Sequence, residues 1–344
     1  MGGTRAYIGS FTTAGGRGIT AATVDPESGE LTVLGAAHAL ENPSFLVPSP
    51  DGDLLYAVGE SEAGLAAAFR TTGTPDGVPV PIRAPVPVGG AGPTHLALAD
   101  RHLVVANYGS GSVSTLPLLP DGAPGGGAVL QHTGSGPDPE RQEGPHAHQV
   151  VPDPSGRWIL SVDLGTDSVR VCAFEDDALV VRRETALRPG SGPRHLAFHP
   201  DGRFVHVLNE LAPTVTVCHW DRDTGALTPR EEIPVQAPGS TGDAYPSGIV
   251  VDPRGRFVWT AIRGQDAIAV LSVEDGGAAL RLTATVDCGG HWPRDLALHP
   301  SGRFLYAANE RSGDVTWFTL DPETGVPARG GAIDAPAASC VVFG

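Results

Sequence analysis

The chain has 344 residues, of which 46 are glycine and 32 are proline, and its formal net charge is −16. A charge of this sign argues against bulk nucleic acid or an anionic membrane face as partners, although a local group of arginines can still attract a small anion. Abundant turn-forming residues indicate many short strands and few long helices.

The cysteines and the first residues bear on the compartment. The four cysteines lie far apart and form no CxxC pair, so zinc and redox motifs are not supported; they are Cys172, Cys218, Cys288 and Cys340. Scattered thiols fit a reducing compartment. The start, MGGTRAYIGSF, has no apolar signal stretch, and no segment approaches the length of a membrane span. We therefore expect a cytoplasmic protein; the sequence gives no indication of its oligomeric state.

One pattern recurs along the chain. Its copies are NPSFLVPSPDGDLLYAVGE from residue 42, GPTHLALADRHLVVANYG from 92, GPHAHQVVPDPSGRWILSVDLG from 144, GPRHLAFHPDGRFVHVLNE from 192, YPSGIVVDPRGRFVWTAIRG from 245, WPRDLALHPSGRFLYAANE from 292 and a clipped APAASCVVFG from 335. Each copy has a proline near its start, which we take as its anchor. These anchors lie 43 to 53 residues apart and are Pro43, Pro93, Pro145, Pro193, Pro246, Pro293 and Pro336.

Each copy predicts four strands. An apolar strand leads into a turn such as HPDG or DPRG, and two more apolar strands follow, the second of them typified by VTVCHWD at 215–221. Three copies then show a second turn, DPESG, DRDTG or DPETG, before a fourth strand. Four short strands at this period are typical of a β-propeller blade. Seven anchors predict seven blades, and thus one all-β domain spanning residues 1–344.

The chain ends complete the ring. Residues 5–11, 18–25 and 30–37 read as the second, third and fourth strands of a blade, and ASCVVF at 338–343 reads as its innermost strand. We therefore expect a closing blade shared by both termini, which removes an open sheet edge.

Antiparallel strands place the residues near the anchors and those ending the second strands on one face of the disc. Near the anchors stand His95, His146, His148, Arg194, His195, Arg294 and Asp295; at the second-strand ends stand Glu60, Asn107, Asp163, Asn209, Glu210, Arg263, Asn309 and Glu310. Arg263 breaks a local rule, because its position holds an acid in several other copies. The long connection 133–144 leads into this face as a candidate lid or rim.

The chain resembles a family in the motifs GPHAHQ, GPRHLAFHPDGRF, LNEL, AIRG and SCVVF. It is similar to the seven-bladed propeller lactonases, that is, the propeller type of 6-phosphogluconolactonase and the related carboxy-cis,cis-muconate cyclases. The resemblance implies a site made of His148, with His146 as a possible second, together with Arg194, Glu210 and Arg263. In this family the site opens a lactone with water or forms one from a diacid, without a metal.

The same residue types suit this chemistry on physical grounds. Lactone hydrolysis needs a base near neutral pH, for which histidine serves, and positive charge at the developing oxyanion, for which arginine serves. Glu210 can orient the imidazole or act as a second acid or base. We predict His148, Glu210, Arg194 and Arg263 as catalytic residues. A second group is predicted to bind the substrate: His95, His146, His195, Arg294 and Asn309. His199 and His299 belong to turns on the other face.

We therefore expect hydrolysis of a small anionic sugar lactone, specifically 6-phosphogluconolactone, with no cofactor and no metal. One alternative is a cyclase-like lactonising isomerase acting on a carboxylated muconate. Another is a binding propeller without catalysis, although the WD and kelch signatures of such scaffolds are absent. Two histidines beside a carboxylate leave a metal site as a third alternative, without a clear ligand set.

Overall fold

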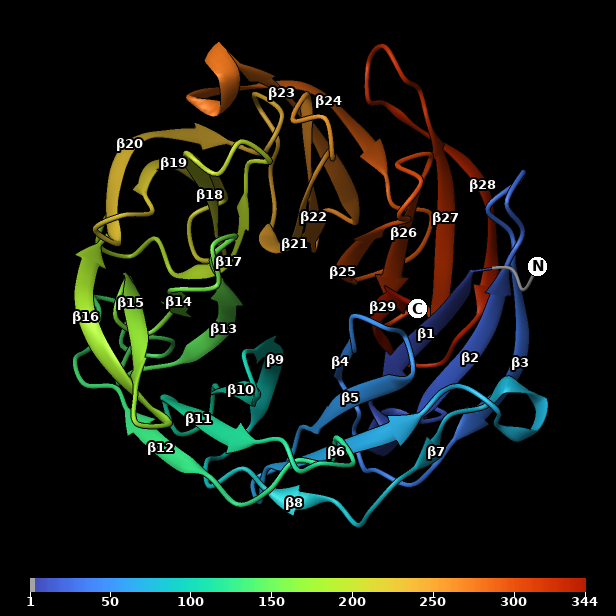
Figure 1. Cartoon of the computed structure of the whole chain (residues 1–344). Coiled ribbons are helices and arrows are strands. Elements are labelled where there is room, and N and C mark those ends of the chain that lie inside the picture. The colour runs from blue at the N-terminus through green and yellow to red at the C-terminus, as the bar shows by residue number, and fades with distance from the viewer. Residues whose placement is uncertain (1–3) are drawn as a thin grey trace.

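The computed structural model describes residues 4–344 and shows seven antiparallel sheets arranged in a ring around a central channel (Figure 1). Six sheets are built from strands that follow one another in the chain, and the seventh joins the C-terminal strand to the first three; one sheet has an additional short strand. The seven-bladed β-propeller predicted from the repeat is therefore confirmed.

The blades follow one another around the ring in chain order. Blade 1 comprises β29 (Ala338–Phe343), β1 (Arg5–Ser10), β2 (Ile19–Val24) and β3 (Leu31–Ala37). Blade 2 comprises β4 (Phe45–Pro48), β5 (Leu54–Gly59), β6 (Leu65–Arg70), β7 (Val80–Pro81) and β8 (Val86–Pro87). Blade 3 comprises β9 (Pro93–Ala99), β10 (His102–Asn107), β11 (Ser112–Pro117) and β12 (Ala128–Gln131). Blade 4 comprises β13 (Ala147–Pro152), β14 (Ile159–Asp163), β15 (Ser168–Glu175) and β16 (Ala178–Ala186).

The remaining blades follow the same order. Blade 5 comprises β17 (Pro193–Phe198), β18 (Phe204–Asn209), β19 (Thr214–Asp221) and β20 (Ala226–Pro234). Blade 6 comprises β21 (Tyr245–Val251), β22 (Phe257–Arg263), β23 (Ala267–Glu274) and β24 (Ala279–Asp287). Blade 7 comprises β25 (Pro293–Leu298), β26 (Phe304–Asn309), β27 (Asp314–Leu320) and β28 (Pro327–Asp334). Three short 3₁₀ turns are η1 (Thr12–Ala14), η2 (Pro75–Gly77) and η3 (Asp275–Gly277).

The two ends of the chain share blade 1, as the sequence predicts. The C-terminal strand β29 pairs antiparallel with β1, and Tyr7 stands opposite Val342 (Figure 1). This pairing closes the ring, because strands from both termini belong to the same sheet.

The hydrophobic core lies between the blades. Seven clusters of buried apolar side chains each join one blade to the next around the ring. Long aromatic side chains reach across these interfaces to the turns of the following blade: Trp158 donates to the carbonyl of Arg222, and Trp259 donates to that of Gly325. The DRDTG and DPETG turns therefore serve as docking points between blades on the face opposite the predicted site.

Most innermost strands begin with a β-bulge, which the sequence does not reveal. In blade 5, Pro193 pairs with Asn209 and His195 with Leu208, so that Arg194 is the unpaired extra residue. The same register shift occurs in blades 1, 3, 4 and 7. A bulge re-aims a side chain, which in this ring brings one residue per blade towards the channel.

The bulges correct two of the anchor assignments. In blade 4 the residue equivalent to Pro193 is Ala147, which pairs with Asp163, and in blade 1 it is Ala338, which pairs with Ser10. Both lie two residues after the prolines that we took as anchors, Pro145 and Pro336. His148 is therefore the structural counterpart of Arg194.

The residue before the bulged strand often adopts a left-handed backbone conformation. Its φ is 56° at Gly192, and a Cβ atom there would lie 2.3 Å from Cγ of Leu211. Gly192→Ala is expected to destabilise the protein by about 2–4 kcal/mol, from backbone strain and overpacking together. Gly202 also has a positive φ, of 72°, but no atom lies within 4 Å of the Cβ that alanine would add, so Gly202→Ala is expected to cost about 1 kcal/mol. Thermal unfolding of both variants tests this, and equal shifts in Tm would contradict it.

Candidate active site

The bulge residues gather around one small cavity on the channel axis. Its lining comprises Ser44, Phe45, Glu60, Thr94, His148, Arg194, His195, Arg294, Asp295 and Ser339. Thr94, His148, Arg194, Arg294 and Ser339 are the extra residues of their bulges. Half of the cavity lining thus comes from one repeated structural position, and the side chains at that position differ from blade to blade.

A second ring comes from the ends of the second strands. Tyr108, Glu210 and Glu310 each donate their backbone N–H to the carbonyl of the residue just before the innermost strand of their own blade. Glu60 donates to Asn42, three residues before β4, and Arg263 stands opposite Tyr245. These residues therefore share one face with the bulge residues, as the strand directions predict.

Glu210 is the centre of the charge cluster at this face. Its Oε2 lies 2.7 Å from Nη2 of Arg263 and 3.1 Å from Nε of Arg194, and its Oε1 lies 2.7 Å from Nη2 of Arg141. Burial alone would raise the pKa of Glu210, but Arg263 and Arg194 hold that pKa well below its ordinary value. Glu210 is therefore an ionised carboxylate at neutral pH.

The two buried arginines respond to burial in the opposite way. Burial and the neighbouring Arg263 lower the pKa of Arg194 to about 9, and burial also lowers the pKa of Arg263. Both guanidinium groups remain charged at neutral pH. Arg194 also contacts the carbonyl oxygen of Ser247 in blade 6, which fixes it across the blade interface.

His148 is buried beside this cluster. Its ring meets the rings of Tyr108 and His195 edge to face, with centroids 5.5 and 5.2 Å apart. Burial, reinforced by Arg194, lowers the pKa of His148 well below the ordinary value, so that the imidazole is neutral. Its Nδ1 has no hydrogen-bond partner within residues 4–344. A neutral imidazole with a free nitrogen beside a cavity is suited to accept a proton.

The floor of the cavity holds His195 and Asp295, which also line the wider channel on the far side. Burial raises the pKa of Asp295 to about 7, so that it is partly protonated at neutral pH. Burial also lowers the pKa of His95 to about 3. His95 lies on the far side of His195, with ring centroids 5.6 Å apart, and lines that wider channel rather than the cavity.

The other predicted binding residues divide into two groups. Arg294 lines the cavity, and its Nη1 lies 2.9 Å from Oε2 of Glu310. His146 lies at the rim, where its ring stacks on the ring of Tyr108 with the two centroids 4.4 Å apart. Asn309 is not brought to the cavity: it is fully buried within its blade, where its Nδ2 donates to Asp314 and Thr316.

Two residues of this face, Arg141 and Tyr108, were not predicted from the sequence. Tyr108 follows the second strand of blade 3, at the position where four other blades place a charged residue, and its hydroxyl oxygen lies 3.4 Å from Nη2 of Arg141. Arg141 belongs to the long connection 133–144. The one signal for it is a basic side chain within the acidic stretch DPERQEG.

Two observations concern metals and membranes. Within the described residues, no group of three or more His, Cys, Asp or Glu side chains is arranged to hold a metal ion. In the same part of the chain, no helix has the length and apolar character needed to cross a bilayer.

Comparison with known proteins agrees with this architecture. A 6-phosphogluconolactonase of Bacillus subtilis is 31% identical over 341 residues, which cover 98% of this chain and 97% of the relative. A putative 6-phosphogluconolactonase from Bacteroides fragilis has a TM-score of 0.91 and 28% identity, with 99% of this chain and 97% of that one covered. A periplasmic gluconolactonase of Pseudomonas aeruginosa has a TM-score of 0.92 and 29% identity, with 99% and 98% covered. The model of the family described as "Lactonase, 7-bladed beta-propeller" matches residues 5–343, and the chain therefore belongs to the seven-bladed β-propeller lactonase family.

Proposed function

We propose that this protein hydrolyses 6-phosphogluconolactone to 6-phosphogluconate. The observation that carries the proposal is the position of the buried, neutral His148 next to a carboxylate that holds three guanidinium groups. The family supplies the lactonase chemistry, and the Bacillus relative bears the name of this substrate.

The reaction assigns one task to each part of the site. His148 takes a proton from a water molecule as its oxygen adds to the lactone carbonyl carbon. Arg194 and Arg263 stabilise the negative charge that develops on the carbonyl oxygen. The tetrahedral intermediate then expels the ring oxygen, which receives the proton from His148, and the product is a hydroxy acid. Glu210 keeps the guanidinium groups charged and oriented.

The local charge favours an anionic substrate despite the overall charge of −16. Four guanidinium groups meet at this mouth, from Arg141, Arg194, Arg263 and Arg294. Three glutamates and the partly protonated Asp295 oppose them, and burial raises the pKa of both Glu60 and Asp295. The excess of positive charge attracts a phosphate or carboxylate group.

The direct test is a turnover assay on 6-phosphogluconolactone, gluconolactone and carboxy-cis,cis-muconate, corrected for spontaneous lactone hydrolysis. We expect saturable turnover that is fastest with the phosphorylated lactone and that survives a chelator. Activity on the diene diacid alone would instead indicate a cycloisomerase, and activity on none of the three would contradict the proposal.

Plain gluconolactone is a second candidate substrate. The Pseudomonas neighbour is called a gluconolactonase, and its identity to this chain is similar to that of the phosphogluconolactonase relatives. The ratio of kcat/KM for the two lactones decides between them.

The pH dependence follows from the lowered pKa of His148. An imidazole with an ordinary pKa near 6.5 loses its basic form below that pH, whereas His148 keeps it. We therefore expect kcat/KM to lose less than half its value between pH 7.5 and pH 6, and to fall only at more acidic pH. Asp295→Asn serves as the comparison, because Asp295 titrates near pH 7 in the same cavity. A wild-type profile that is half-maximal at pH 6.5, and unchanged by Asp295→Asn, would contradict the assignment of His148 as the base.

A further inference from the structure

We propose that Arg141 binds the phosphate group of the substrate and thereby sets the preference for the phosphorylated over the plain lactone. This inference rests on the proposed function, and it assigns substrate specificity to the connection 133–144 between blades 3 and 4.

Arg141 differs in exposure from the other two arginines on Glu210. Its side chain is 37% exposed, against 4% for Arg194 and 9% for Arg263. It faces the solvent at the mouth, whereas the other two lie below it. A substrate that enters the cavity with its lactone carbonyl near Arg194 or Arg263 would leave its far end near Arg141.

The guanidinium of Arg141 has donors to spare. Within the described chain both of its hydrogen bonds come from Nη2, to Glu210 and to the hydroxyl of Tyr108. Nε and Nη1 therefore remain for a ligand. A planar guanidinium offers two parallel N–H groups to phosphate oxygens, which is the geometry that a phosphate monoester requires.

The residue after Arg141 fixes the connection to the body of the propeller. Gln142 is fully buried; its Nε2 donates to the carbonyl of Leu164 and to Asp167, each at 2.8 Å, and its Oε1 accepts from the backbone N–H of Asp138. Asp167 in turn accepts from the backbone N–H of Gly192, next to the bulge that carries Arg194. The backbone that carries Arg141 is thus held in register with the catalytic side chains.

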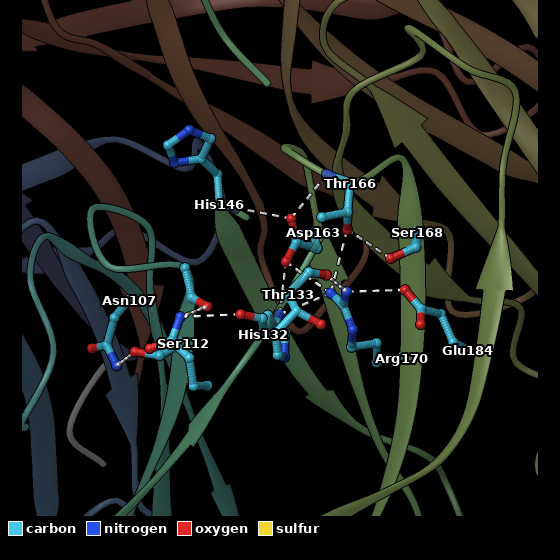
Figure 2. A network of polar contacts seen from close by, with 12 residues as sticks. Asn107, Ser112, His132, Thr133, His146, Asp163, Thr166, Ser168, Arg170 and Glu184 are labelled. Carbon is cyan, nitrogen blue, oxygen red and sulfur yellow. Dashed lines mark hydrogen bonds and ion pairs between the residues drawn. The ribbon is translucent and has the colours of Figure 1, made fainter. Parts of the chain in front are cut away.

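A buried charge network clamps both ends of the connection (Figure 2). At the start, Arg170 donates from Nη2 to the carbonyl of Thr133 at 2.8 Å, and from Nη1 to Asp163 at 2.8 Å. At the end, the backbone N–H of His146 donates to Asp163 at 2.9 Å, and His132 contacts the same carboxylate at 2.7 Å.

This network stays charged. Burial would raise the pKa of Asp163, but hydrogen bonding to His132 and the charge of Arg170 bring the pKa below its ordinary value. Of the two alternatives for the connection, a lid and a rim, the clamps favour a rim. A rim held in this way presents Arg141 in a fixed position, so that phosphate binding costs little ordering of the loop.

The test compares the two lactones in Arg141→Gln. We expect KM for 6-phosphogluconolactone to rise about 10- to 100-fold with a smaller change in kcat, and kcat/KM for gluconolactone to stay within about threefold. Arg141→Lys should recover part of the loss. The matched control is Arg101→Gln, because Arg101 is exposed in the turn between β9 and β10 on the opposite face. Equal losses for both lactones would overturn the proposal.

A binding measurement separates this inference from the proposed function. Titration calorimetry measures the affinity of inorganic phosphate for the wild-type protein and for Arg141→Gln. This measurement needs no turnover. Weaker binding in the variant supports the phosphate site even if neither lactone is hydrolysed, whereas equal affinities overturn it even if 6-phosphogluconolactone proves to be the substrate.

Discussion

Replacing His148 with alanine is expected to lower kcat for lactone hydrolysis by about 10²- to 10⁴-fold, the usual contribution of a general base. The imidazole lines the cavity, is held neutral and has a free Nδ1. His195 also lines the cavity, but both of its ring nitrogens lie within 3.5 Å of Nη1 of Arg194. Steady-state kinetics with 6-phosphogluconolactone measures the effect. His38→Ala, at an exposed position in blade 1, is the matched control.

Two further measurements distinguish a base from a structural histidine. The Tm of His148→Ala should remain within a few degrees of wild type, since the ring makes no hydrogen bond through Nδ1. Added imidazole should restore part of the rate, because the substitution leaves space for it. A rate within threefold of wild type, or a loss of activity that parallels a loss of folded protein, would contradict the catalytic assignment.

The fold was open to prediction from the sequence because each blade repeats the same local signals. The apolar strands, the DPxG-type turns and the period of about 50 residues recur often enough to define seven blades and the shared closing blade. The bulges were not predictable in this way. A bulge depends on how a strand pairs with its neighbour, so the anchors in blades 4 and 1 were each placed two residues too early.

The candidate site was predictable where it rests on strand ends and hidden where it rests on long-range contacts. Strand direction alone places Glu210 and Arg263 on one face, and the structure brings them to 2.7 Å. Arg141 reaches the same carboxylate only because Gln142 and the Asp163 network fold its connection back over the mouth. No local pattern specifies those contacts.

Asn309 was predicted to bind the substrate, but it is a structural residue of its blade. It ends a second strand, as Glu210 nearly does, but the pleat turns its side chain into the blade towards Thr316. Asn209 and Asn107 make the equivalent contacts with hydroxyl groups of the third strand, at Thr216 and Ser114. Because successive strand residues point to opposite sides, a shift of one position separates a structural amide from a site residue.

Glu210→Gln is expected to have the largest effect on stability, a loss of about 3–5 kcal/mol, because it removes the negative charge that compensates buried guanidinium groups. Arg194 and Arg263 would keep their positive charges with only a neutral amide between them. Glu310→Gln is the comparison: Glu310 is 23% exposed and holds Arg294, which also has Glu60 nearby, so its loss should cost about 1 kcal/mol. Thermal or urea unfolding at pH 7 measures both.

The same variant tests whether the arginines form an anion site. If they do, an added anion takes the place of the missing carboxylate, so that phosphate should raise the Tm of Glu210→Gln more than it raises that of wild type or of Glu310→Gln. Catalysis should not return with stability, because a bound phosphate occupies the space that the substrate needs. An unchanged Tm in Glu210→Gln would mean that the carboxylate is not required to hold the two guanidinium groups, and the assignment of Glu210 as their counter-charge would then be wrong.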